Sequence, residues 1–167
     1  MNLSILMLPI VFFASCVSKK ENKPIANIII QPAQLSDTSR YTIISFDKNK
    51  IYIFGKADTV KPATLTEQEI EETESLLIRA VAEYNKKMTS KYQKVDSLVN
   101  YKRQLVPYIN QKGEKVVFVN FFCKDFRWNE NWRKELVMVD DGGSCFFNIQ
   151  INLTTKNTYN LYVNGVA

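Results

Sequence analysis

Histidine is absent from the 167-residue sequence, and cysteine, glycine and proline are scarce, at three, five and five residues. Without histidine the chain cannot form a Ser-His-Asp or Cys-His catalytic centre, nor any metal site that needs an imidazole ligand. The low glycine and proline content argues against a disordered or linker-dominated chain. These absences exclude several common classes of hydrolase and metalloprotein, and they favour a folded domain.

Apolar side chains make up 46% of the sequence and charged side chains 23%, which is typical of a globular protein. The length predicts one domain. The net charge is +5 and the sequence pI is about 9.0, but the lysines are scattered and no recognition motif accompanies them. We therefore expect no nucleic-acid partner, although a weak attraction to anionic lipid headgroups is compatible with this charge.

The N-terminus begins with an almost unbroken apolar run over residues 3–14. The run is too short to span a bilayer, which takes about 20 residues, but it has the length of the apolar region of a signal peptide. It ends in the motif Phe13-Ala14-Ser15-Cys16. This motif resembles the lipobox of bacterial lipoproteins, in which a bulky apolar residue and two small residues precede a cysteine. One departure is that no lysine or arginine precedes the run; the alternative is a buried N-terminal strand or helix.

The resemblance to bacterial lipoproteins implies cleavage before Cys16 and a lipid attached to its thiol. We therefore expect a signal peptide at residues 1–15, a polar tether at residues 16–39 and a single domain at residues 40–167. The domain is then placed in the cell envelope. The residues after Cys16 match poorly the acidic signal that sends some lipoproteins of the Bacteroidota to the cell surface, which favours the periplasmic face.

The first half of the domain predicts a β-hairpin and one long helix. Residues 41–46 and 51–54 are rich in β-branched and aromatic side chains, and a polar turn separates them. A helix is expected over residues 66–87, where Thr66 and Glu69 form a capping-box pattern. Ile70, Leu77 and Val81 then fall on one apolar stripe.

The second half predicts strands. They cover residues 101–109, 115–123, 135–140 and 145–153, with a last strand near residues 159–163. Tight turns are expected at residues 110–113 and 140–143. The sum is an α+β fold in which one long helix packs on a curved antiparallel sheet of about five or more strands. This order of elements resembles cystatin-like folds. Residues 101–167 contain an aromatic strand that ends in a cysteine, an Asp-Gly-Gly turn followed by Cys-Phe-Phe, and a closing Val-Asn-Gly-Val-Ala. In these motifs they are similar to small lipoproteins of the Bacteroidota, a resemblance that implies no activity.

The two cysteines left after Cys16, namely Cys123 and Cys145, are too few for a structural zinc site. In a plain meander with a strand at 135–140 between them, they lie at opposite ends of strands about 9.6 Å apart sideways. A disulfide needs Cα atoms within about 7 Å. We therefore expect two buried thiols that act as small apolar residues.

The loop after residue 123 offers the best candidate binding residues, namely Arg127, Trp128 and Trp132. Tryptophan and arginine in a loop are typical interface anchors; the alternative is that both indoles fold back over the edge of the sheet. Asp125 and Glu130 form a weaker candidate, as a carboxylate pair for acid–base chemistry.

Two further candidate sites are an acidic pair and the outer surface of the last two strands, and each also has a purely structural interpretation. Asp140 and Asp141 have the oxygen ligands that calcium prefers, but two acids before Gly-Gly are also typical of a turn. An outward polar and aromatic surface is predicted on the last two strands, where the alternative is an ordinary solvated face. Its residues are Phe146, Asn148, Gln150, Tyr162 and Asn164.

The sequence therefore predicts a membrane-anchored envelope lipoprotein that binds a protein or a glycan and is not an enzyme. Its membrane contact is the lipid on Cys16, and no metal or other cofactor is expected. The alternatives are a hydrolase that uses carboxylates and an inhibitor-like module.

Overall fold

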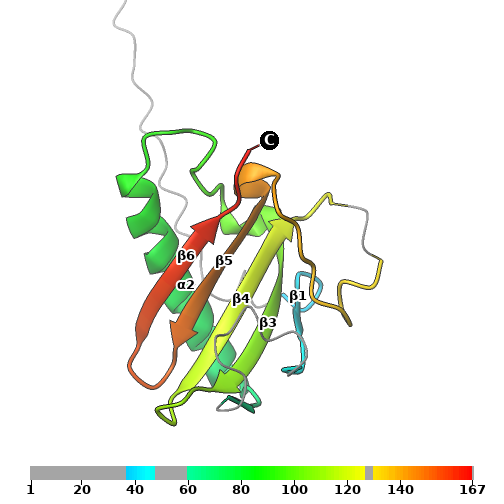
Figure 1. Cartoon of the computed structure of the whole chain (residues 1–167), viewed down its shortest axis with the longest axis vertical. Coiled ribbons are helices and arrows are strands. Elements are labelled where there is room, and N and C mark those ends of the chain that lie inside the picture. The colour runs from blue at the N-terminus through cyan, green and yellow to red at the C-terminus, as the bar shows by residue number, and fades with distance from the viewer. Residues whose placement is uncertain (1–36, 48–59, 127–129, 167) are drawn as a thin grey trace, which may run out of the picture.

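The computed structural model describes residues 37–47, 60–126 and 130–166. Within these ranges one long α-helix lies across a sheet of six strands (Figure 1). The elements in chain order are β1 (Tyr41–Ile43), β2 (Lys61–Pro62), α2 (Glu67–Lys87), η3 (Leu98–Asn100), β3 (Tyr101–Ile109), β4 (Lys115–Cys123), η4 (Gly143–Cys145), β5 (Phe146–Asn152) and β6 (Asn157–Val163). The predicted α+β class is confirmed.

The sheet has the strand order β1-β3-β4-β5-β6, and the short β2 also pairs with β3. Strands β3 to β6 form an antiparallel meander, but β1 runs parallel to β3, with Tyr41 opposite Arg103. The sheet is therefore mixed, which corrects the fully antiparallel expectation. The predicted hairpin partner of β1, residues 51–54, lies outside the described residues.

Helix α2 begins where the sequence predicted. The Thr66 hydroxyl accepts the N–H of Glu69, and the Glu69 carboxylate accepts the N–H of Thr66. This capping box satisfies backbone donors that the first turn otherwise leaves unpaired. Acidic residues in the first turn and lysines in the last also agree with the helix dipole.

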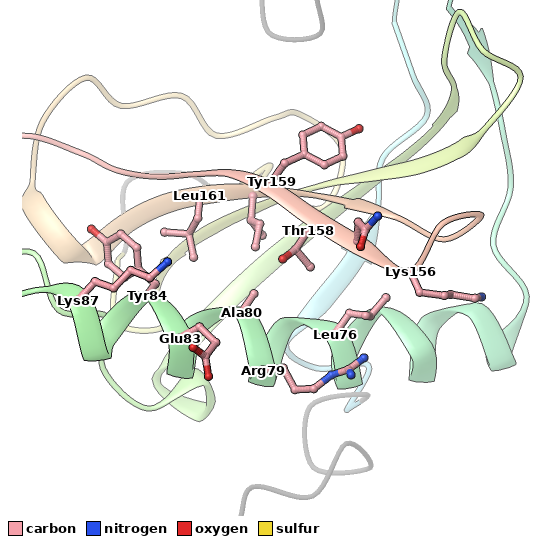
Figure 2. Close-up of a pocket in the computed structure, with 12 residues that line it drawn as sticks. Leu76, Arg79, Ala80, Glu83, Tyr84, Lys87, Lys156, Thr158, Tyr159 and Leu161 are labelled. Atoms are coloured by element: carbon pink, nitrogen blue, oxygen red, sulfur yellow. The ribbon is translucent and has the colours of Figure 1, made fainter.

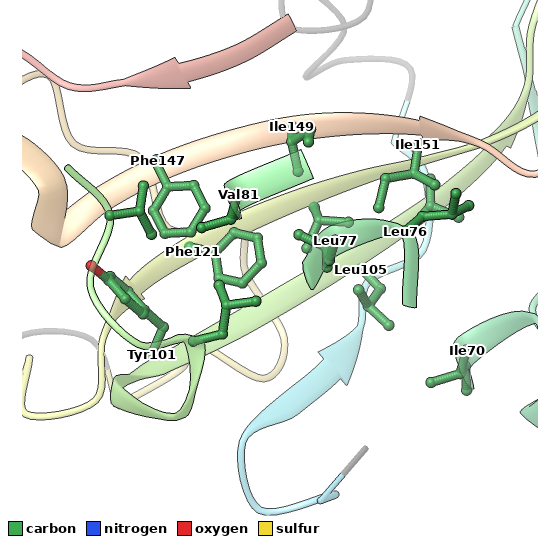
Figure 3. Close-up of a cluster of buried hydrophobic side chains, with 14 of the residues drawn as sticks. Ile70, Leu76, Leu77, Val81, Tyr101, Leu105, Phe121, Phe147, Ile149 and Ile151 are labelled. Atoms are coloured by element: carbon green, nitrogen blue, oxygen red, sulfur yellow. The ribbon is translucent and has the colours of Figure 1, made fainter. Parts of the chain in front are cut away.

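The main core lies between α2 and the sheet (Figure 3). Leu77 of the helix and Leu105, Val119 and Ile149 of the sheet have no exposed surface. Phe121 stacks on Phe147 with ring centroids 4.2 Å apart. At about 25 cal/mol per Å² of buried apolar surface, this layer is the largest source of stability in the fold.

Strands β3 and β4 are also covered on the face opposite α2. Phe46 and Val60 pack there against Val106 and Phe118, so both faces of the central strands are buried. The alternation of apolar and polar residues in the last strands predicts a sheet with one buried and one wetter face, and this holds only for the β5–β6 half. The reason is that residues 44–46, 60 and 132–139 cross the outside of β3 and β4.

No strand forms at residues 135–140, which corrects the prediction for that segment. β4 already pairs with β3 on one side and β5 on the other, so it has no free edge. Since nothing lies between β4 and β5, the end of β4 meets the start of β5, with Phe122 opposite Phe146. Cys123 and Cys145 form a disulfide, with Cα atoms 5.0 Å apart. The expectation of two reduced thiols was wrong because it assumed the extra strand.

β6 differs from the regular alternation that the sequence predicted. Asn148 and Gln150 of β5 stand opposite Tyr162 and Tyr159, so β6 has one extra residue between them. Asn160 has a positive φ of 55° at this bulge. The bulge turns Tyr159 outward beside Tyr162, whereas strict alternation along the strand predicts that Tyr159 faces inward with Leu161.

None of the helical segments in the described ranges combines the length and the hydropathy needed to cross a bilayer.

Candidate functional site

Of the three predicted interface residues, the structure describes only Trp132. Arg127 and Trp128 lie outside the described residues. Trp132 is buried, with 8% of its surface exposed, and its ring packs edge-on against Phe122 at 5.7 Å between centroids. The guanidinium of Arg133 covers the ring at 4.3 Å. Trp132 therefore folds back onto the sheet, which leaves little of its indole for a partner to contact.

Two buried amides hold the loop that contains Trp132, and we call Gln104 and Asn120 the amide clamp. Gln104, fully buried, donates to the carbonyls of Trp132 and Glu135 and accepts the N–H of Val137 at 2.8 Å. Asn120 donates to Gln104 at 3.1 Å and to the carbonyl of Val137 at 2.7 Å. The clamp replaces strand pairing for residues 132–137, which otherwise would bury unsatisfied backbone groups.

The predicted outer surface of β5 and β6 is divided in two by this loop. Asn164 is buried and donates to the carbonyls of Val139 and Asp141. Phe146 packs edge-on against Phe126, with centroids 5.0 Å apart. These two residues therefore serve the fold. The others remain accessible, with Asn148 and Gln150 half-buried and Tyr162 59% exposed.

The candidate carboxylates are all exposed, namely Asp125, Glu130, Asp140 and Asp141. Gly142, next to the Asp140-Asp141 pair, has the positive φ that was predicted, at 91°, but it leads into the short helix η4 and does not join two strands. In the ranges that the structure describes, no group of three or more acidic or cysteine side chains is placed to hold a metal ion.

A groove of about 420 Å³ separates α2 from the edge strand β6 (Figure 2). Its floor is apolar and consists of Leu76 and Ala80 from the helix with Ile149 and Leu161 from the sheet. Its rim is polar, because the flank of α2 and the outer residues of β6 line it. The rim residues are Arg79, Glu83, Tyr84, Lys87, Lys156, Asn157, Thr158 and Tyr159.

Some charged side chains at the rim form ion pairs within the fold and others do not. Lys156 pairs with Glu72 at 2.6 Å, and Glu83 pairs with Lys86 at 2.8 Å, which lowers the pKa of Glu83. Arg79 and Lys87, in contrast, make no hydrogen bond or ion pair with any other residue in the described ranges. The groove therefore carries two cations without an ion-pair partner in the described ranges, although Lys87 is close enough to Glu83 to help lower the pKa of that carboxyl.

Two tyrosines beside the groove have phenols that are hydrogen-bond donors at neutral pH. Tyr84 lies on the flank of α2, whereas the ring of Tyr159 points away from the helix (Figure 2). Burial raises the pKa of Tyr84. Burial also raises the pKa of Tyr159, although a hydrogen bond with Tyr108 acts in the opposite direction. Both side chains therefore stay protonated, and they combine an apolar ring with a polar tip, as residues at interfaces commonly do.

The backbone of β6 is itself part of this site. In the described sheet β6 pairs with β5 on one side and has no strand on the other. An edge strand directs alternate N–H and C=O groups outward, where they are available to another strand. The bulge at Asn160 divides this edge into two short runs.

The sequence did not reveal the groove, because it is formed by a helix flank and a strand edge that lie far apart in the chain. One signal existed for the clamp: Asn120 interrupts the apolar run of β4, and Gln104 lies opposite it on β3. A polar residue in a central strand indicates a buried hydrogen-bond partner.

No protein-family model, no curated protein and no solved structure matches the chain.

Proposed function

We propose that the chain is an exported, lipid-anchored binding module of the bacterial cell envelope. In this proposal it has no catalytic role, and it holds an extended segment of a partner polypeptide in the groove between α2 and β6. The lipid on Cys16 fixes the domain to the membrane, so that binding takes place close to the bilayer surface.

Two observations support the export of the domain. Residues 13–16 have the pattern of a lipobox after an apolar run. The disulfide joins Cys123, the last residue of β4, to Cys145, which directly precedes β5. Disulfides persist in oxidising compartments and are rare in the cytosol. The bridge therefore supports placement of the folded domain outside the cytoplasm, independently of the leader.

The groove beside an open strand edge is the observation that carries the binding role. An exposed edge is a liability unless a partner or a protective device covers it. Here the open edge of β6 lies beside a groove with an apolar floor and a polar rim, to which α2 contributes. Recognition by strand addition uses this geometry. In that mode the backbone provides hydrogen bonds and the neighbouring side chains select the sequence.

The anchor and the disulfide can be measured together. We expect the intact mass of the protein extracted from membranes to correspond to a chain that starts at a lipid-modified Cys16 and carries one disulfide. A Cys16→Ser variant removes the acylated thiol, so its uncleaved chain is expected to carry no lipid. An unprocessed, unmodified wild-type chain contradicts the lipoprotein assignment.

Filling the groove is expected to weaken polypeptide binding strongly. Ala80 lies on the floor, so the indole of an Ala80→Trp variant occupies the space of the ligand. Phage-displayed random nonapeptides selected on the full chain in detergent are expected to lose about tenfold or more in affinity for this variant. Ala82→Trp is the matched control, because Ala82 is exposed on α2 outside the groove. Selected peptides that bind both variants equally well place recognition elsewhere.

A further inference from the structure

We infer that the segment bound in this groove carries two acidic side chains four residues apart, which lie on the helix side of a strand added to β6. This inference rests on the proposed function and names the chemistry of its ligand.

The charges of the groove favour an acidic ligand. The paired residues, Lys156 with Glu72 and Glu83 with Lys86, are neutralised within the fold. Arg79 and Lys87 are exposed and line the same groove, and in the described ranges neither makes a hydrogen bond or an ion pair; Lys87 interacts only at longer range with Glu83. A bound carboxylate beside each of them forms a charge-assisted hydrogen bond without having to displace an existing one.

The two cations are spaced to match an extended chain. They lie on one flank of α2, slightly more than two turns apart, or about 12 Å along the axis. Residues i and i+4 of a strand are about 13 Å apart and project from the same face. Figure 2 shows Arg79 towards the Lys156 end of β6 and Lys87 beside Leu161, so the helix flank follows the strand. One acidic residue is therefore available to each cation.

Glu83 lies between Arg79 and Lys87 on this flank. It disfavours a third acidic side chain at position i+2 of the ligand, because the two carboxylates would repel each other. The expected pattern is therefore acidic at i, neutral or basic at i+2 and acidic at i+4.

Three synthetic nonapeptides test the inference on the full chain in detergent. They share the frame Thr-Val-X-Val-Thr-Val-X-Val-Thr, with X as Glu, Gln or Lys, so that only the charge of the two positions differs. The protein variants are wild type, Arg79→Gln/Lys87→Gln and the control Lys91→Gln/Lys112→Gln. The control removes the same charge from two exposed lysines outside the groove. Affinity is measured by fluorescence anisotropy, and the binding site by the amide shifts of β6 in NMR spectra.

The Glu peptide is expected to bind wild type about three- to tenfold more tightly than the Gln peptide, and the Lys peptide most weakly. The preference is expected to vanish in Arg79→Gln/Lys87→Gln, to persist in the control and to shrink at high salt. Equal binding of all three peptides with shifted β6 amides overturns the acidic ligand but leaves the groove as the binding site. If no peptide binds, or if an envelope glycan alone shifts these amides, the proposed function fails as well.

Discussion

Replacing Arg103 by methionine is expected to lower the free energy of unfolding by about 3–5 kcal/mol. Arg103 of β3 and Glu74 of α2 form an ion pair at 2.7 Å, and neither side chain has any exposed surface. Removal of the guanidinium leaves the Glu74 carboxylate buried without its counter-charge. Urea denaturation followed by circular dichroism measures the loss. The matched control is Lys115→Met, because the Lys115–Glu69 pair is partly exposed, and we expect it to cost at most about 1 kcal/mol.

The pH dependence of Arg103→Met identifies the buried charge as the cause. Burial raises the pKa of Glu74 above its ordinary 4.5, while the neighbouring guanidinium acts in the opposite direction. Without Arg103 the pKa rises further, so the folded state binds a proton that the unfolded state releases. Stability of the variant is therefore expected to increase as the pH falls from 7 towards 4.5. A variant equally unstable across this range contradicts the explanation.

The double variant Glu74→Leu/Arg103→Met tests whether the intact ion pair itself adds to the free energy of unfolding. Both guanidinium nitrogens Nη1 and Nη2 and the Oε2 atom of Glu74 lack a hydrogen-bond partner in the described structure. The pair is therefore imperfectly satisfied, and two apolar side chains avoid its desolvation cost. We expect the double variant to be within about 1 kcal/mol of wild type or more stable, as for other replaced buried ion pairs.

The sequence contained the signal for this pair, but its residues also have an ordinary surface interpretation. Glu74 follows Ile70 by one turn and precedes Leu77 by nearly another, which places it on the buried stripe of α2. Arg103 alternates with Tyr101 and Leu105 on the inward face of β3. Each charge alone resembles a solvated residue, and only the packing of helix on sheet brings them together.

Patterns of neighbouring residues were sufficient to predict helix α2 and strands β3 and β4. The capping box and the apolar stripe predicted α2, the β-branched and aromatic residues of 101–109 predicted β3, and a strongly apolar run predicted β4, both strands with the bounds that the structure has. Residues 135–140 have the same strand-like pattern, but tertiary contacts override it, because β4 has no free edge and the amide clamp binds this backbone instead. The disulfide was missed as a direct consequence.

The candidate site was less predictable than the fold. Trp132 was selected as an exposed anchor by its residue type, although its loop folds back and buries it. The groove depends on β6 being the last strand of the sheet and on the flank of α2 that faces it. Neither property is written in a local pattern, since both arise from the order of strands. Arg79 and Lys87 therefore read in sequence as ordinary surface charges.

The second large effect is expected at the amide clamp. Replacing Gln104 by leucine keeps a similar size but removes the partners of the Trp132 and Glu135 carbonyls, the N–H of Val137 and one donor of Asn120. Each buried group left unsatisfied costs about 1–3 kcal/mol. We therefore expect a loss of about 3 kcal/mol or more in the free energy of unfolding, measured by urea denaturation. Gln150→Leu is the control, since Gln150 is only half-buried on β5, and we expect it to cost less than about 1 kcal/mol.

Hydrogen exchange distinguishes a local role of the clamp from a general loss of packing. In the wild type the N–H of Val137 donates to Gln104 and is buried, so its exchange is expected to be slow although it belongs to no strand. In Gln104→Leu this amide is expected to exchange faster than those of β3 and β4, because the loop opens without unfolding of the sheet. If the amides of Val137, β3 and β4 all exchange faster by the same factor, the clamp has no local role. A fast Val137 amide in the wild type contradicts it as well, because the loop then has no fixed position over the sheet.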